Sequence, residues 1–212
     1  MPNKYYILAA LILGLFLSAD SFSQTFYGTI EQKEFYEGRD KEFRDKETSP
    51  LKEEDFAEFN GLNYYSIDDK YRLTAVLTKT NSKEYFLMPT SSDKVQKYIK
   101  YAVLTFEIDK TAYKLNVYQA DEAVRRAFPE YKDLLFIPFK DLTNGSESYA
   151  GGRYLYILDT DKTEIILDFN LASNPSCAYG SDKYSCPIPP RENYLKVKIK
   201  AGEKIYHTNS NK

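Results

Sequence analysis

Hydrophobic and polar residues alternate with a period of two over much of the chain after residue 60, a pattern typical of half-buried β-strands. Within 112–118, Tyr113, Leu115 and Val117 fall on one face, while polar residues fall on the other. Residues 134–139 are apolar on both faces, which predicts a central strand. Strands are expected at 71–76, 84–88, 99–108, 112–118, 134–139, 154–159, 164–169 and 194–200.

Turn signals join some of these strands into hairpins. Asp109-Lys110 predicts a tight hairpin, and residues 160–162 predict another between the strands that flank them. In 194–200, three lysines alternate with apolar residues, which predicts an edge strand protected from aggregation. About nine short strands with this spacing predict a mainly β fold, either a sandwich or a partly open barrel.

The region before these strands has a helical pattern. Residues 25–47 are rich in Glu, Lys, Arg and Gln and contain no proline, which favours a helix. Ser49-Pro50 predicts the start of a second, short helix that ends near Phe59, because proline is preferred at the first helical position. Residues 121–128 predict a further short helix. One or two N-terminal helices should therefore pack on the β domain.

The first 23 residues have the layout of a signal peptide. Lys4 precedes an apolar run at 5–17, and small and polar residues follow up to Ser23. The run is shorter than the roughly 20 residues that cross a bilayer. We expect cleavage after Ser23, with Ala19 as the alternative, and a periplasmic or extracellular mature protein without a membrane span.

The remaining chain divides into three parts by pattern. We expect an N-terminal helical segment at 24–60, one β domain at 61–207 and a disordered tail at 208–212. The length of the chain after residue 23 suits a single domain with a substantial core.

The composition argues against some classes of binding partner. The formal net charge is -2 with both signs mixed, so we expect neither nucleic acid nor an anionic membrane as a partner. Tyrosine is abundant, with 20 residues, and tryptophan is absent. Tyrosine suits half-buried sheets, which is the preferred interpretation, and the alternative is a stacking surface for sugars or aromatic ligands.

Two segments, 141–153 and 168–193, fit neither strands nor ordinary turns. Long loops without secondary structure are often functional, and the flanking strands could bring both loops to one end of the sheet. The loops contain the polar side chains that we expect to contact a ligand: Arg153, Asp168, Asn170, Asn174 and Glu192.

The same loops carry a family resemblance, in a series of separated motifs in one order along the chain. The motifs lie at 49–51, 59–62, 139–145, 149–155, 168–170, 174–175, 177–179, 184–190, 192–193 and 201–203. This series resembles the bacterial family catalogued as domain of unknown function 1684. The resemblance covers most of the mature chain and implies a predominantly β domain, and it names no reaction.

Cys177 and Cys186 are the two cysteines of the chain. In an oxidising compartment two cysteines suffice for one bridge, so a structural disulfide is the preferred interpretation. A metal pair, a thiol nucleophile and a redox couple are the alternatives. Zinc normally takes four ligands, and His207 is the only histidine, so we expect no metal site. Nothing in the sequence indicates a cofactor.

Glu147, Asp168 and Glu192 lie in or beside the two loops and are candidate catalytic residues. Paired carboxylates act as acid and base in glycoside hydrolysis. The alternative is structural, because Asp168 could brace a turn and either glutamate could pair with Arg153.

The sequence therefore supports three hypotheses. The leading one is an exported module that binds a small molecule or protein partner, both unidentified, through the loops 141–153 and 168–193. The second is a hydrolase with carboxylate acid and base residues in those loops. The third makes both loops structural, with the active surface elsewhere.

Overall fold

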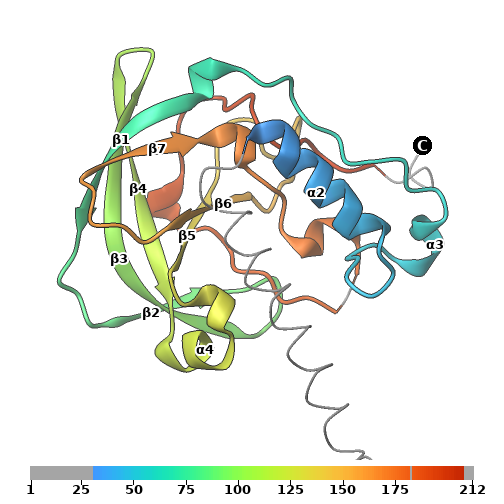
Figure 1. The fold of residues 1–212 in the computed structure, drawn as a ribbon, viewed down its shortest axis with the longest axis horizontal. Helices are drawn as coiled ribbons and strands as arrows, with labels where there is room; N and C mark the ends of the chain where they lie inside the picture. The colour runs from blue at the N-terminus through green and yellow to red at the C-terminus, as the bar shows by residue number, and fades with distance from the viewer. Residues whose placement is uncertain (1–30, 182, 208–212) are drawn as a thin grey trace, which may run out of the picture.

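The computed structural model describes residues 31–181 and 183–207 and consists of one curled antiparallel sheet with a few short helices (Figure 1). The strand order is β6-β5-β4-β3-β1-β7, and β2 pairs with β3. The strands are β1 (Arg72–Lys79), β2 (Tyr85–Pro89), β3 (Val95–Ile108), β4 (Thr111–Ala120), β5 (Leu134–Phe139), β6 (Arg153–Leu158) and β7 (Glu164–Asp168). The sheet curls into a half-barrel, which confirms the mainly β prediction. Seven strands are present in the described residues, against about nine expected.

The turn between β3 and β4 confirms the first predicted hairpin. Asp109 and Lys110 both have positive φ, 50° and 62°, as a two-residue turn between twisted strands requires. The strands that it joins pair from Ile108↔Thr111 to Tyr98↔Ala120, the longest register in the sheet.

The second predicted hairpin is wrong, because β6 and β7 do not pair. β6 pairs with β5, and β7 pairs with β1, so the two strands form opposite ends of the sheet. The connection between them crosses the opening of the half-barrel. Asp159 N bonds to Asp133 O at 2.7 Å, and Leu77 N bonds to Thr163 O at 2.7 Å, so each end of the connection is held by a different part of the sheet.

The predicted edge strand at 194–200 is also wrong. Its alternation is correct in burial, since Leu195 and Ile199 lie in the core. Its backbone bonds, however, go to the loop after β5: Leu195 N bonds to Lys140 O at 2.8 Å, and Leu142 N bonds to Val197 O at 3.0 Å. Alternation reports which side chains are buried and does not identify the backbone partner.

The helices are short except for the first. They are α2 (Gln32–Arg44), α3 (Glu53–Phe56) and α4 (Glu122–Ala127), with 3-10 turns η1 (Asp69–Tyr71), η2 (Pro129–Tyr131), η3 (Phe169–Leu171), η4 (Ser176–Tyr179) and η5 (Arg191–Asn193). The helix predicted to begin at Ser49-Pro50 begins later, at Glu53, because the Ser49 hydroxyl accepts from Leu51 N in a turn of its own. Among the described residues no helix is long and apolar enough to cross a membrane.

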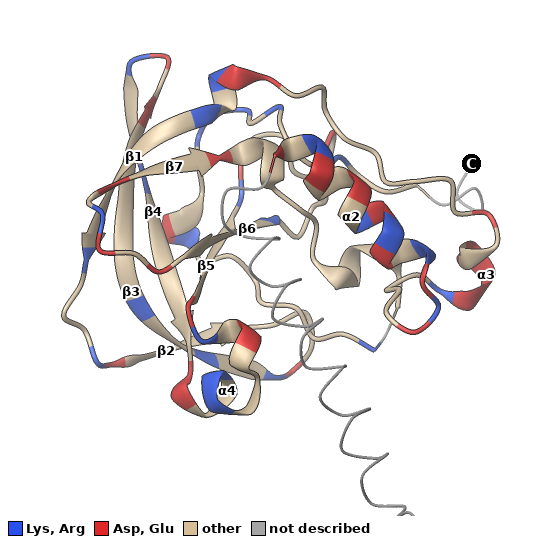
Figure 2. Ribbon diagram, viewed as in Figure 1, with Lys and Arg blue, Asp and Glu red and all other residues tan. Residues whose placement is uncertain are grey.

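The main core fills the concave side of the half-barrel. It combines alternate residues of the strands with apolar residues of the C-terminal segment, including Leu195, Ile199 and Ala201. A second core cluster joins α2 to the loop 168–193 through Phe43 and Tyr179, whose rings lie 4.5 Å apart. The N-terminal helices thus pack on the loops of the β domain more than on its sheet. Basic and acidic residues are interspersed along α2 and around the sheet (Figure 2).

Candidate functional site

A β-bulge in β3 gives one end of the sheet a second apolar face. The register with β4 shifts between Lys100 and Ala102. A one-residue shift exchanges the faces of a strand. Residues of β3 after the bulge, such as Leu104, therefore point into the main core, whereas Tyr98 points to the opposite side. The sheet alone would leave this second face open to solvent.

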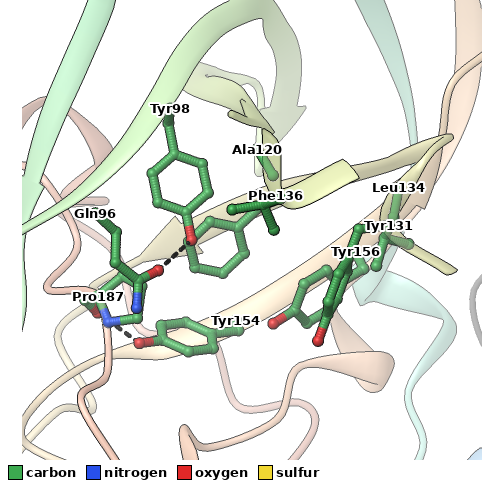
Figure 3. A pocket seen from close by; sticks show the side chains of 10 residues that line it. Gln96, Tyr98, Ala120, Tyr131, Leu134, Phe136, Tyr154, Tyr156 and Pro187 are labelled. Carbon is green, nitrogen blue, oxygen red and sulfur yellow. Dashed lines mark hydrogen bonds between the residues drawn. The ribbon is translucent and has the colours of Figure 1, made fainter. Parts of the chain in front are cut away.

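An aromatic cavity of about 240 Å³ lies on this second face (Figure 3). It is lined by Gln96, Tyr98, Ala120, Val124, Tyr131, Leu134, Phe136, Tyr154, Tyr156 and Pro187. The Phe136 ring is at its centre, stacked on Tyr98 at 5.4 Å and edge-on to Tyr154 at 4.8 Å. None of the described residues that line it carries a carboxylate, ammonium or guanidinium group.

The tyrosine hydroxyls at the cavity rim are held by protein acceptors. Tyr98 donates to Gln96 Oε1 at 2.9 Å, and Tyr154 donates to the Pro187 carbonyl (Figure 3). Burial raises the pKa of Tyr98 and of Tyr154, so both stay neutral at physiological pH. The cavity therefore presents ring surfaces and dipoles and no fixed charge.

A second cavity of about 310 Å³ adjoins the first, and the two share Tyr131, Tyr154, Tyr156 and Pro187. Its other lining residues come from α2 and from the loop 168–193: Phe35, Arg39, Glu42, Ser173, Asn174, Pro175, Ser176, Tyr184, Ser185 and Cys186. This polar cavity combines aromatic side chains, such as Phe35 and Tyr184, with hydroxyl, amide and ion-paired groups.

Arg39 links the polar cavity to a buried network. Its Nη1 pairs with Glu42 at 2.9 Å and its Nη2 lies 3.9 Å from Glu203 Oε2. Glu203 is fully buried, accepts from Asn174 N at 3.0 Å and also accepts from the Tyr179 hydroxyl. Burial raises the pKa of Glu203. Within the described structure, Arg39 Nε and Asn174 Oδ1 are buried without a hydrogen-bond partner.

The loop 168–193 is fastened where it forms the wall of the polar cavity. Cys177 and Cys186 form a disulfide, with Cα atoms 6.1 Å apart. Ser91 N donates to Cys186 O at 2.8 Å, and Ile188 N donates to Pro89 O at 2.8 Å, which docks the loop on the end of β2. The wall is therefore a constrained structure.

A third cavity of about 490 Å³ lies between the free edges of β6 and β7, at the opening of the half-barrel. Arg72 and Asp168 line it and pair at 2.8 Å. Leucine and isoleucine side chains of both edges make up much of its wall.

The structure places Arg153 inside the protein and away from these cavities' walls. Its side chain is fully buried over the Phe139 ring. Its guanidinium donates to three backbone carbonyls of the C-terminal segment, those of Ile199, Ala201 and Glu203. Asp141 lies 3.4 Å from Nη2. In this geometry Arg153 anchors the C-terminal segment.

The other residues expected to bind a ligand lie in different places. Asp168 is buried and accepts from Gln32, Arg72 and Asn170. Asn170 is fully buried and bonds to the backbone of Asp68. Of the five, Asn174 lines the polar cavity, and its amide donates to Lys204 O at 2.8 Å.

The three candidate catalytic carboxylates are not gathered in one site. Glu147 pairs with Lys198 at 3.0 Å and with Lys200 at 3.1 Å, and these contacts lower its pKa. Asp168 lies beside the opening between β6 and β7. Glu192 is exposed in η5. A carboxylate pair acting on one bond needs two such groups in a common cleft, which this arrangement does not provide.

Neither the aromatic cavity nor Arg39 was predicted from the sequence. The rings of the aromatic cavity come from β3, β5, β6 and η2, which are separate elements in the sequence. The one sequence feature that pointed to the aromatic cavity was the high tyrosine content. A stacking surface was the less favoured interpretation of that content. For Arg39, a charged residue in a charged helix has no distinguishing pattern.

The chain is similar to proteins whose function is also open. Residues 57–204 match the family described as Protein of unknown function (DUF1684). No curated protein matches the chain. The solution NMR structure of an uncharacterized protein from Haloarcula marismortui is 36% identical, with a TM-score of 0.62, and the match covers 80% of this chain and 89% of that chain. The bacterial distribution expected for the family is not tested by these matches. The family model matches more than half of the chain, so the chain belongs to the DUF1684 family of proteins of unknown function.

Proposed function

We propose that this protein is an exported small-molecule-binding module whose ligand occupies the aromatic cavity and the polar cavity beside it. The observation that carries the proposal is the gathering of five aromatic rings around one open cavity with no charged wall residue among those described: Tyr98, Tyr131, Phe136, Tyr154 and Tyr156. Concave, mostly apolar sites with a few placed polar groups are the usual form of small-molecule sites.

The size of the cavities supports a ligand that spans both. Small-molecule sites usually enclose about 300–1,000 Å³. The aromatic cavity, at about 240 Å³, is smaller than this, and the adjoining polar cavity adds about 310 Å³. Tyr154 and Tyr156 belong to both walls, so one molecule can contact the two cavities at once.

The walls favour an uncharged group in the aromatic cavity. A charge placed among Tyr98, Phe136 and Leu134 would lose its hydration without gaining a partner. An apolar ring gains dispersion and edge-to-face contacts with the same side chains. In this proposal the loop 168–193 contributes Asn174, the serines and Pro187 to the polar wall.

The proposed module is exported from the cytoplasm. The signal-peptide pattern at 1–23 lies outside the described residues, and the proposed periplasmic or extracellular location rests on it. The Cys177–Cys186 bridge supports this location, because disulfides persist in oxidising compartments.

A fluorescence titration tests the proposal. The uncharged fluorophore phenylnaphthylamine, whose emission rises in apolar surroundings, should bind the mature protein saturably. Ala120→Phe adds a ring to the cavity wall and should weaken the probe by about ten-fold or more, because it fills the space that the probe needs.

Ala112→Phe is the matched control, since Ala112 lies exposed at the other end of β4. It should leave probe binding unchanged. Absence of saturable binding, or equal binding by both variants, would show that the aromatic cavity is not a binding site.

A further inference from the structure

We infer that the ligand is amphipathic and uncharged, with an apolar ring in the aromatic cavity and a hydroxyl-bearing group in the polar cavity, as in an aryl glycoside. This inference rests on the proposed function. It concerns the chemistry that the second cavity selects.

The charged groups of the polar cavity are already paired with each other. Among the described residues that line the polar cavity, Arg39 and Glu42 are the charged ones, and they pair with each other at 2.9 Å. The guanidinium also faces Glu203 at 3.9 Å. An anionic ligand group would compete with these carboxylates for one guanidinium, and a cationic group would meet that guanidinium. A neutral group meets neither penalty.

The polar cavity offers both hydrogen-bond donors and acceptors. The polar wall contains the hydroxyl-bearing residues Ser173, Ser176 and Tyr184 together with Arg39, which only donates, and Glu42, which only accepts. A carboxylate or phosphate ligand offers acceptors alone, and an ammonium offers donors alone. A ligand hydroxyl both donates and accepts, so a group with several hydroxyls satisfies such a wall in full.

The two cavities share part of their walls. Tyr156 is tilted against Phe136 at 5.3 Å on the side of the aromatic cavity and also lines the polar cavity. The ligand's polar and apolar parts must therefore be directly joined, and the C–H face of a sugar ring can lie against the same aromatic wall. A free sugar would leave the aromatic cavity empty, and a plain aromatic molecule would leave the polar cavity to water.

Calorimetry with three related probes tests the inference on the mature, oxidised protein. Phenol supplies the ring alone, phenyl β-glucoside adds a neutral polyhydroxyl group, and phenyl phosphate adds a charged one. We expect the glucoside to bind about ten-fold or more tightly than phenol, and phenyl phosphate to bind no better than phenol.

Two variants locate the effect. Ser176→Tyr places a ring in the polar cavity and should remove the advantage of the glucoside while phenol binding remains, which also shows that the variant is folded. Ser66→Tyr, at an exposed position outside both cavities, should keep the advantage.

The outcomes separate the two proposals. If neither phenylnaphthylamine nor any phenyl probe binds, the proposed function itself fails. If phenol binds and the glucoside binds no better, or phenyl phosphate binds most tightly, the inference is overturned while the aromatic site stands. An advantage that survives Ser176→Tyr would also overturn it.

Discussion

Arg153 Nη2 donates a hydrogen bond to the backbone carbonyl of Ile199 at 2.8 Å, which joins β6 to the C-terminal segment. The same guanidinium bonds to the carbonyls of Ala201 and Glu203 and lies against Asp141 in a fully buried position. A side chain that was a candidate ligand contact thus fastens the segment that closes the half-barrel.

Replacing Arg153 by Met should destabilise the protein by about 3–5 kcal/mol, because it leaves a buried carboxylate and three buried carbonyls without the guanidinium that pairs with them. Urea unfolding of the mature protein measures the loss. Arg126→Met is the control: Arg126 is largely exposed and pairs with Glu122 within one helix, so the change should stay within about 0.5 kcal/mol. Equal stability of the two variants would contradict an anchoring role.

The β3–β4 turn predicts opposite effects for one kind of substitution. Lys110 has φ 62°, a conformation that costs energy for any residue with a Cβ, so Lys110→Gly should raise stability by about 0.5–1 kcal/mol. Lys114 is exposed within β4, and Lys114→Gly should lower stability by a similar amount. Thermal unfolding of both variants checks the signs, and a loss at both positions would refute the turn geometry.

The Cys177–Cys186 bridge closes a loop with a sequence separation of 9 and should contribute about 2.7 kcal/mol in the chain-entropy treatment. The double variant Cys177→Ser, Cys186→Ser should lose stability of that order in denaturant unfolding. Because Cys186 lines the polar cavity, the variant should also bind the glucoside probe more weakly, while phenol binding changes little. Two reactive thiols in the native, unreduced protein would rule out the bridge.

Glu203 should give the stability a pH dependence of defined sign. Burial raises its pKa in the folded state above the ordinary value of 4.5, so the folded protein retains a proton that the unfolded chain has lost. Its contribution to stability therefore falls as pH rises from the unfolded pKa through the folded one. Glu203→Gln removes this fall, so stability relative to wild type should increase with pH across that window, measured by urea unfolding at several pH values.

Glu147→Gln is the counterpart with the opposite sign. Hydrogen bonds from Lys198 and Lys200 lower the pKa of Glu147, so its contribution is present above the unfolded pKa and is lost as pH falls through the folded one. The variant should lose stability relative to wild type at neutral pH and approach it in acid. Urea unfolding at several pH values measures both variants. Parallel pH curves for wild type and Glu147→Gln would contradict the effect of the two lysines, and parallel curves for wild type and Glu203→Gln would contradict the effect of burial.

Much of the candidate site was beyond sequence reasoning for a specific reason. A strand was expected at 99–108, whereas β3 begins at Val95 and contains a bulge before Ala102. The bulge moves Tyr98 to the face opposite Leu104, and this second face is where the aromatic cavity lies. The hydrophobic pattern of a strand does not reveal one extra residue in its pairing when aromatic residues lie on both faces of the strand.

For the polar residues of the loops, the sequence likewise identified the residues but not their role. Asp168, Asn170 and Arg153 were expected to contact a ligand, and the structure uses all three in buried hydrogen bonds within the protein. A polar side chain in a long loop has the same sequence signature whether it faces a ligand or satisfies buried backbone groups. Only burial and partners distinguish the two.

By itself the sequence determined most of the strands, the tight turn at Asp109-Lys110 and the mainly β class, because these depend on local backbone preferences and on alternation within a few residues. The tertiary structure alone decided that β6 and β7 lie at opposite ends of the sheet, that 194–200 closes the half-barrel, and that rings from β3, β6 and the η2–β5 segment surround one cavity. Those outcomes depend on which segments meet in space, and contacts between residues far apart in the chain are not encoded in any local pattern.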